Sequence, residues 1–143
     1  MKRFLVLAAA VTAAAGVTVA SVSASSPRSG ALEATKECSE YTGGAGSFCT
    51  FTSSSLKALG VGSRIVYLSA AGATSLDTDV VLEVGPGNKA FGHCLLVFAD
   101  LPGECTFWGG TGQFTWFHAD VVVSTSDGVN WQWDGSYSFS PRD

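Results

Sequence analysis

Acid–base chemistry in this sequence would centre on one histidine and a nearby carboxylate, His118 and Asp120. They are two positions apart in a β-forming run, so on a strand both side chains point to the same side, about 7 Å apart. A His–Asp pair that faces a cavity can exchange protons with a bound molecule. A pair on the outer face would instead be exposed to solvent. We therefore take His118 and Asp120 as candidate catalytic residues, with both placements open.

Glu83 and His93 are further candidates for the same chemistry. Glu83 is a candidate proton-transfer residue, although it shares a strand face with Asp79 and Val81, a pattern more typical of a solvated face. His93 precedes Cys94, so their side chains point to opposite faces of a strand. If Cys94 is bridged outside, His93 points inward, either towards a ligand or into the core.

The last part of the sequence has the clearest period of two. Apolar residues occupy alternate positions there, with polar residues between them. The apolar face carries Val129, Trp131, Trp133, Tyr137 and Phe139. Such a face packs inward, where aromatic side chains either fill a core or line a cavity. Our candidate ligand-binding residues are Trp116, Trp131, Trp133, Tyr137 and His93.

A glycine cluster, Gly109 to Gly112, lies between aromatic residues. A phosphate-binding glycine loop opens a helix, and a P-loop also needs a lysine. Here the run from Gln113 has no helical pattern, and no lysine follows Lys89. Glycines in strand-like sequence mark a bulge, a tight bend or a close backbone approach. The cluster therefore predicts a bend that lets a long strand from Gln113 curve, and we expect no nucleotide cofactor.

Four cysteines, Cys38, Cys49, Cys94 and Cys105, suggest two disulfides. Turn-forming residues lie between the first two and between the last two, so two strands joined by a turn would bring each pair together. We predict these local pairs, each stabilising the fold by roughly 2–4 kcal/mol. Spacings typical of zinc ligands do not occur in the sequence, so we expect no metal site.

The first residues predict export. Lys2 and Arg3 precede an apolar run that is short for a membrane anchor, and small residues up to Ala24 suit cleavage. We assign residues 1–24 to a signal peptide, 25–36 to a flexible leader and 37–143 to one folded, extracellular domain. Without the signal, six Lys and Arg stand against twelve scattered Asp and Glu. This balance argues against nucleic acid or a membrane surface as partner.

Short β-rich runs separated by turn residues make up the domain. They cover Ser47–Thr52, Arg64–Ser69, Asp79–Val84, Ala90–Phe98, Glu104–Trp108, Gln113–Thr125 and Asn130–Phe139, with another near Ala34–Tyr41. Seven or eight antiparallel strands in about 110 residues fit either a β-sandwich or a small closed barrel.

The segments FWGGTGQFTWFHADVVVS and DGVNWQWDGSYSFS resemble the last two strands of the allene oxide cyclase and dirigent-protein superfamily. Those proteins share a G-G-T-G-x-F segment and a terminal W-x-G-x-Y-x-F-like strand. The stretches DTDVVLEVGPGNKAFGHCLLVF, GECTF and GSFCTFTSSSLKALGVGSRIVY resemble a small secreted bacterial branch of it. The resemblance covers roughly Cys38 to Phe139 and implies an all-β, eight-stranded antiparallel, calycin-like barrel around an apolar cavity.

Members of this superfamily cyclise unstable oxylipins, steer the coupling of phenoxy radicals or cyclise polyketides. The resemblance therefore implies a barrel that binds a small apolar or aromatic molecule. If it is an enzyme, it would be an isomerase or cyclase without a metal or nucleotide cofactor. Dirigent-type barrels often form homo-oligomers, so such an assembly stays open.

The ligand-binding hypothesis predicts a cavity of roughly 300 Å³ or more, lined by several of the aromatic candidates. Two alternatives make other predictions. A non-catalytic module that binds a surface, glycan or protein would expose a strip of aromatic residues. A structural protein of the cell envelope would have a filled barrel.

Overall fold

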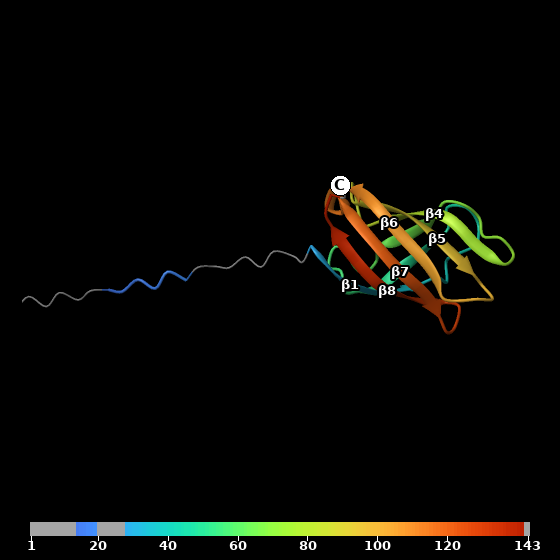
Figure 1. Ribbon diagram of the computed structural model, residues 1–143, viewed down its shortest axis with the longest axis horizontal. Coiled ribbons are helices and arrows are strands. Elements are labelled where there is room, and N and C mark those ends of the chain that lie inside the picture. Colours follow the sequence, from blue (N-terminus) through green and yellow to red (C-terminus); the bar gives the residue numbers. More distant parts are fainter. Residues whose placement is uncertain (1–13, 20–27, 142–143) are drawn as a thin grey trace, which may run out of the picture.

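A computed structural model describes residues 14–19 and 28–141 of the chain and contains eight strands (Figure 1). Buried and exposed residues alternate along most of them; in β4 every second residue from Leu76 to Leu82 is buried. The elements are β1 (Ser29–Glu37), β2 (Phe48–Ser54), β3 (Arg64–Tyr67), β4 (Ser75–Glu83), β5 (Lys89–Val97), β6 (Gly103–Thr111), the short 3-10 helix η1 (Gly112–Phe114), β7 (Phe117–Thr125) and β8 (Asn130–Phe139).

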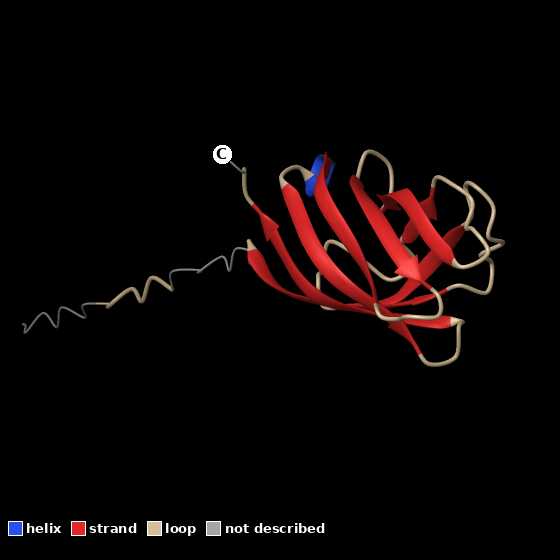
Figure 2. Ribbon diagram, turned by 45° about the vertical axis from the view of Figure 1, so that its right-hand side comes forward, coloured by secondary structure: helices blue, strands red, loops and turns tan. Residues whose placement is uncertain are grey.

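The strands close into an antiparallel barrel. Each strand pairs with the next in the sequence, and β8 pairs with β1 from Ser29↔Ser138 to Glu37↔Asn130. β1 and β8 lie side by side in Figure 1, and Figure 2 shows the strands wrapped around one interior. The prediction of an all-β, eight-stranded antiparallel barrel is confirmed, and the sandwich alternative is excluded.

Side chains fill the middle of the barrel. Trp133 of β8 packs edge-to-face against Phe51 of β2, with ring centres 4.9 Å apart, and lies 5.5 Å from the ring of Phe107. All three residues are almost completely buried. An eight-stranded barrel is about wide enough for its interior to be filled in this way. The face of the last strand predicted to point inward, which carries Trp133 and Tyr137, does so.

Both predicted disulfides are present. Cys38 is joined to Cys49, and Cys94 to Cys105. Cys94 and Cys105 face each other across β5 and β6 and are buried inside the barrel. Because Cys94 points inward, the neighbouring His93 points outward, opposite to the orientation required for binding a ligand inside the barrel.

The barrel begins earlier in the chain than the sequence predicts. The flexible leader expected over residues 25–36 is wrong from Ser29 onward, because β1 starts there. The small and polar residues of this segment do not indicate a strand, but they form one that pairs with β2 on one side and β8 on the other. The folded domain therefore includes Ser29 to Lys36 as well as the predicted range from residue 37.

The predicted signal peptide, residues 1–24, lies outside the described residues except for residues 14–19. Those six residues form no helix or strand and are exposed. Among the described parts of the chain, no helix has the length and apolar character needed to cross a membrane.

The glycine cluster ends β6 and turns the chain into η1, instead of bending one long strand. The strand predicted from Gln113 begins only at Phe117, because η1 occupies the preceding residues. The turn places Phe114, which is fully buried, inside the end of the barrel. Its ring packs edge-to-face against that of Phe117 at 5.1 Å. The turn at the glycine cluster thus lets Phe114 fill this end of the barrel.

Two of these glycines are required by their surroundings. A Cβ atom on Gly110 would lie 2.2 Å from the carbonyl oxygen of Lys89, closer than any side chain permits. Gly112 has a φ of 59°, a conformation that residues with a Cβ rarely adopt. A Cβ there would also lie 2.3 Å from Oδ1 of Asn88. Close backbone approach, one of the roles predicted for the cluster, is therefore what the structure shows.

Candidate functional site

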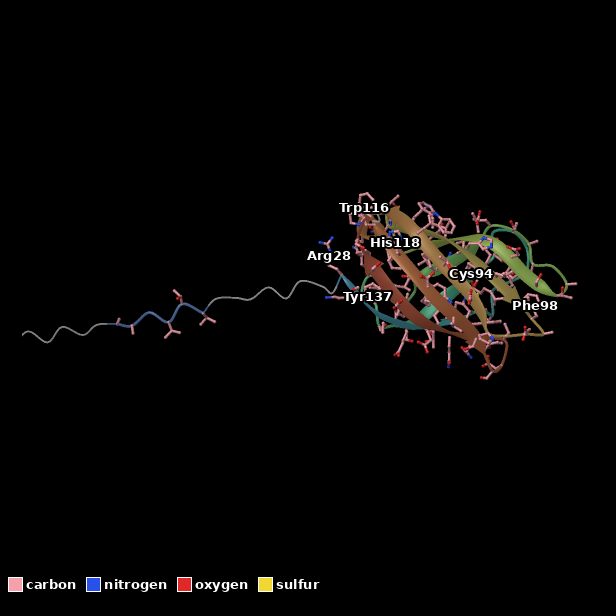
Figure 3. All side chains as sticks on the ribbon, viewed as in Figure 1. Arg28, Cys94, Phe98, Trp116, His118 and Tyr137 are labelled. Carbon is pink, nitrogen blue, oxygen red and sulfur yellow. A yellow bond between two sulfur atoms is a disulfide. The ribbon has the colours of Figure 1, made fainter. Side chains whose placement is uncertain are left out.

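The two ends of the barrel differ. At the closed end, η1 and the loop between β2 and β3 bury Phe114, Leu56 and Leu59. At the other, open end, a pocket of about 260 Å³ enters the barrel. Figure 3 shows Phe98, at the open end, far from Trp116 and His118. The open-end pocket is lined by Lys36, Cys38, Tyr41, Cys49, Tyr67, Leu76, Leu96, Phe98, Gly128 and Trp131.

Larger hollows exist elsewhere on the molecule. One of about 530 Å³ runs over β1, β2 and β8, and one of about 600 Å³ lies beside the loop between β2 and β3. Neither is lined by a buried amine or carboxylate. We therefore treat the open-end pocket as the candidate site.

Lys36 sets this pocket apart, because a lysine is almost never fully buried without a partner charge. The residue is only 3% exposed. Leu32, Ala34 and Lys36 occupy the inward positions of β1, so the period of the strand points the lysine into the barrel. Its neighbours on the adjacent strands are Phe51 of β2 and Trp131 of β8.

The amine of Lys36 has one hydrogen-bond partner and two aromatic neighbours. Its Nζ donates to the Tyr67 hydroxyl at 2.5 Å. It lies 5.2 Å from the centre of the Tyr67 ring and 5.3 Å from that of Trp133, within the range of cation–π interactions. No ion pair joins Lys36 to a carboxylate in the part of the chain that the structure describes. The amine is thus enclosed by aromatic groups without a counter-ion.

Burial changes the titration of both groups. It lowers the pKa of Lys36 from 10.5 to about 7, because the ammonium form loses its hydration. It raises the pKa of the Tyr67 hydroxyl, so that the phenol stays protonated at neutral pH. Near pH 7 the pocket therefore holds a large fraction of neutral amine, which is a nucleophile, next to a phenol that can donate a proton.

Two further polar atoms are buried without a hydrogen-bond partner among the described residues, the Tyr41 hydroxyl and Trp133 Nε1. Tyr41 lines the pocket and packs edge-to-face on Tyr67 at 5.1 Å. The hydroxyl of nearby Ser47 donates to the Gly44 carbonyl. An unpaired buried polar group costs free energy. A ligand that accepts a hydrogen bond from Tyr41 would recover that cost.

The turn between β7 and β8 holds Trp131 at the rim of the pocket. Asp127 accepts hydrogen bonds from the Asn130 side chain and from the amides of Asn130 and Val129, and these bonds lower the pKa of Asp127 to about 2. Trp131 Nε1 donates to the Gly128 carbonyl at 3.2 Å. Together these bonds fix the indole that lines the pocket.

The predicted ligand-binding aromatics are only partly brought together. Trp131 lines the pocket, and Trp133 lies beneath it against the amine of Lys36. Tyr137 is buried nearer the closed end, further along β8. Trp116 lies outside the barrel, 55% exposed, at a positive φ of 64°. The pocket is also somewhat smaller than the roughly 300 Å³ that the ligand-binding hypothesis predicts.

The predicted catalytic residues lie on the outer face of the barrel. Asp120 is exposed while Val121 is buried, so the strand face that His118 shares with Asp120 points outward. His118 is nevertheless 8% exposed, and among the described residues no side-chain hydrogen bond joins it to Asp120. Glu83 is also exposed and forms an ion pair with Lys89 at 3.8 Å. None of the three candidates lines the open-end pocket.

His93 lies outside the barrel in a cluster with two carboxylates. Its Nδ1 is 2.9 Å from Asp79 Oδ1, and its Nε2 is 2.8 Å from Asp77 Oδ1. These hydrogen bonds raise the pKa of His93, the bond with Asp79 most strongly. The described residues contain no group of His, Cys, Asp and Glu arranged to hold a metal. The cluster is therefore a charged pairing of neighbouring surface side chains on β4 and β5.

Lys36, Tyr41 and Tyr67 are site residues that the sequence predictions missed. Lys36 falls where the predicted leader overlaps the strand predicted near Ala34–Tyr41, and the two tyrosines stand alone in polar or mixed sequence. The one available signal is the alternation of Leu32 and Ala34 with polar residues, which points Lys36 inward when it is continued by two positions.

Comparison of the chain with protein-family models, with curated proteins and with solved structures finds no match.

Proposed function

We propose that this chain is a small-molecule-binding barrel and that its ligand enters the open-end pocket. The observation that carries the proposal is a pocket with aromatic walls and a buried amine, Lys36, that no carboxylate of the described residues neutralises. A volume of about 260 Å³ suits a molecule of one aromatic ring with a short polar tail. The tail would lie near Lys36 and Tyr41, which supply the polar contacts.

The unpaired amine supports a functional role because it is costly for the fold. Burying an ionisable group without a partner charge destabilises a protein. A methionine would occupy similar space without that cost, since its side chain is unbranched and apolar. Perturbed ionisable groups in pockets are concentrated at functional sites. Lys36 is therefore better explained by a ligand than by stability.

Export and a relationship to the allene oxide cyclase and dirigent superfamily belong to the same proposal. The eight-stranded antiparallel barrel agrees with the superfamily's architecture. Two disulfides support an oxidising compartment, where such bonds persist. An isomerase or cyclase activity would then use the shape of the pocket to hold a reactive conformer of the ligand.

Binding of one-ring aromatic probes tests the proposal. Cinnamyl alcohol, cinnamaldehyde and cinnamate would be titrated into the purified protein, and binding followed by NMR and calorimetry. We expect saturable binding of at least one probe at a single site. Leu76→Phe, which fills the pocket wall, should weaken that binding at least tenfold. Trp116→Ala, which removes an aromatic residue outside the barrel, is the control and should leave it unchanged.

Two results would contradict this function. The first is a lack of saturable binding by every probe at millimolar concentration. The second is binding that is lost in Trp116→Ala and kept in Leu76→Phe, because the ligand would then lie on the outer surface.

A second candidate function is favoured by the exposure of two tryptophans. Trp108 and Trp116 are 52% and 55% exposed, and Phe91, on the strand next to Trp108, is also exposed. Exposed aromatic residues are typical of surfaces that bind glycans or proteins. Co-sedimentation with insoluble cellulose, chitin and peptidoglycan tests this function. Retention that is lost in Trp108→Ala and Trp116→Ala, and kept in Trp131→Ala, would support it.

A further inference from the structure

We infer that Lys36 takes a carbonyl compound as its ligand: the amine condenses with a small aromatic or α,β-unsaturated aldehyde in the open-end pocket and forms a Schiff base. The inference rests on the proposed function and names the chemical class of the ligand. The groups around the Lys36 amine and the walls of the pocket both support it.

The described groups around Lys36 supply no negative charge that would hold its proton. Tyr67 is its hydrogen-bond partner, the rings of Tyr67 and Trp133 lie just over 5 Å away, and its cross-strand neighbours are Phe51 and Trp131. None of these groups carries a negative charge at neutral pH. Burial, which lowers the pKa of Lys36, acts in the same direction. A neutral, desolvated amine attacks carbonyl carbons, whereas an ammonium cannot.

The walls of the pocket suit an aromatic aldehyde. Trp131, Phe98 and Tyr41 supply flat apolar surface, and Leu76 and Leu96 supply the rest. Lys36 is both buried and part of the pocket lining, so its amine can be reached only through the space that the ligand itself fills. A carboxylate ligand would instead bind best to the ammonium form of Lys36, which loses its hydration in this buried position.

The reaction balances without an oxidant or reductant. The lone pair of Nζ forms a bond to the carbonyl carbon while the C=O π pair moves to oxygen. A proton passes from nitrogen to that oxygen and gives a carbinolamine. The C–O bond then breaks, the oxygen leaves as water, and nitrogen loses its second proton as the C=N bond forms. Tyr67, hydrogen-bonded to Nζ, is placed to donate a proton to the departing oxygen and to take one back from nitrogen.

The other lysines of the folded part offer a built-in comparison. Lys57 is exposed in the loop between β2 and β3, and Lys89 is exposed and ion-paired with Glu83. Neither lies in an enclosed pocket with a phenol on its amine. Selective reaction at Lys36 would therefore report the pocket and not the general reactivity of lysine.

Reductive trapping with cinnamaldehyde as the probe tests the inference. The full-length mature protein is incubated with the aldehyde near pH 7, reduced with cyanoborohydride, and analysed by intact mass and peptide mapping. We expect one adduct, equal to the aldehyde less one oxygen atom, mapped to Lys36 at a rate at least tenfold above Lys57 and Lys89. Lys36→Met should lose this adduct, Lys57→Met should keep it, and Tyr67→Phe should form it roughly tenfold more slowly.

The same probes separate the failure of the inference from the failure of the proposed function. Labelling spread over Lys57, Lys89 and the N-terminal amine, with no preference for Lys36, overturns the inference. If cinnamyl alcohol binds in the pocket and no adduct forms at Lys36, the binding function stands and the Schiff base does not. If cinnamate binds at least tenfold more tightly than both neutral probes, Lys36 acts as a cation, which also overturns the inference. If no probe binds, both proposals fail.

Discussion

Lys36 and His93 are basic residues in opposite environments of the same barrel. Both are on strands, but β1 points Lys36 inward and β5 points His93 outward. Lys36 has no carboxylate partner in the part of the chain that the structure describes, and burial lowers its pKa. His93 lies within 2.9 Å of two carboxylates, and their hydrogen bonds raise its pKa. His93, on the outer face, is thus paired with carboxylates, whereas Lys36, inside the barrel, has no carboxylate partner among the described residues.

The comparison separates a stabilising cluster from a candidate site. A raised histidine pKa means that protonation strengthens the fold, while a lowered lysine pKa means that protonation weakens it. The two groups therefore contribute to stability with opposite pH dependence. A group kept in the protein despite its cost to stability is the better functional candidate.

Lys36→Met should stabilise the protein near pH 7 by on the order of a few kcal/mol, because it removes a buried amine whose pKa is lowered to about 7. The unfolded chain takes up the lysine proton below pH 10.5, and the folded protein takes it up only below about 7. The free energy of unfolding of the native protein should therefore fall as the pH decreases from about 9 to 7, a window below the ionisation of tyrosines.

Urea unfolding near pH 7 and near pH 9, with disulfides intact, measures this effect. In Lys36→Met the fall between the two pH values should be absent. Lys57→Met removes an exposed lysine and should keep both the stability and the pH dependence of the native protein. An unchanged pH dependence in Lys36→Met would show that the amine titrates as an ordinary lysine.

Tyr67→Phe should lower the stability by about 1–2 kcal/mol, because the Lys36 amine loses its hydrogen-bond partner in a buried site. The pKa of Lys36 should fall further, since the bond to the hydroxyl favours the charged form. NMR titration of the Lys36 side chain would follow the shift. Tyr41→Phe is the matched control: its hydroxyl is buried without a partner, so its loss should cost less or even stabilise. An equal cost for both variants would argue against a special role for Tyr67.

His93→Gln should destabilise the protein below pH 6 by less than about 1 kcal/mol, because its ion pairs are partly exposed. A raised pKa gives stability that is present below the ordinary value of 6.5 and lost as the pH rises through the folded value. Near pH 9 the variant and the native protein should be equally stable. Thermal unfolding near pH 5 and pH 9 measures this pH dependence of the stability, which is opposite in sign to the one expected for Lys36.

The two carboxylates of this cluster should also be distinguishable. Asp79→Asn should lower the pKa of His93 more than Asp77→Asn, because the bond to Asp79 is the larger contribution. NMR titration of the imidazole would measure both. An equal effect of the two variants would show that the histidine moves between its partners in solution.

Asp127→Asn should have the smallest effect, confined to acid. The lowered pKa of Asp127, about 2, gives stability that is present above the ordinary value of 3.8 and lost as the pH falls towards 2. The variant should therefore lose less thermal stability than the native protein between pH 4 and 2. Because the amide oxygen can still accept bonds from the turn, probe binding near Trp131 should stay within twofold of the native affinity. A larger loss would show that the charge itself positions the indole.

Much of the fold could be predicted from local pattern. The alternation around Trp133 placed one face of β8 inward, and turn residues between strands marked most boundaries to within a few residues. The pairs Cys38–Cys49 and Cys94–Cys105 followed from turns between neighbouring strands. The predictions failed where local composition misleads. The first half of β1, before Ala34, consists mostly of small and polar residues, and the turn at Gly112 lies in a segment whose other residues favour one strand.

The sequence by itself determined the strand periodicity, the local disulfides and the antiparallel class of fold, because each depends on residues close together in the chain. Only the tertiary structure decided the candidate site. Lys36, Tyr41, Tyr67 and Trp131 come from β1, the loop after it, β3 and β8, and closure of β8 onto β1 brings them around one pocket. The lowered pKa of Lys36 is a consequence of that enclosure, since the ammonium group of a lysine in the unfolded chain stays hydrated and keeps its ordinary pKa.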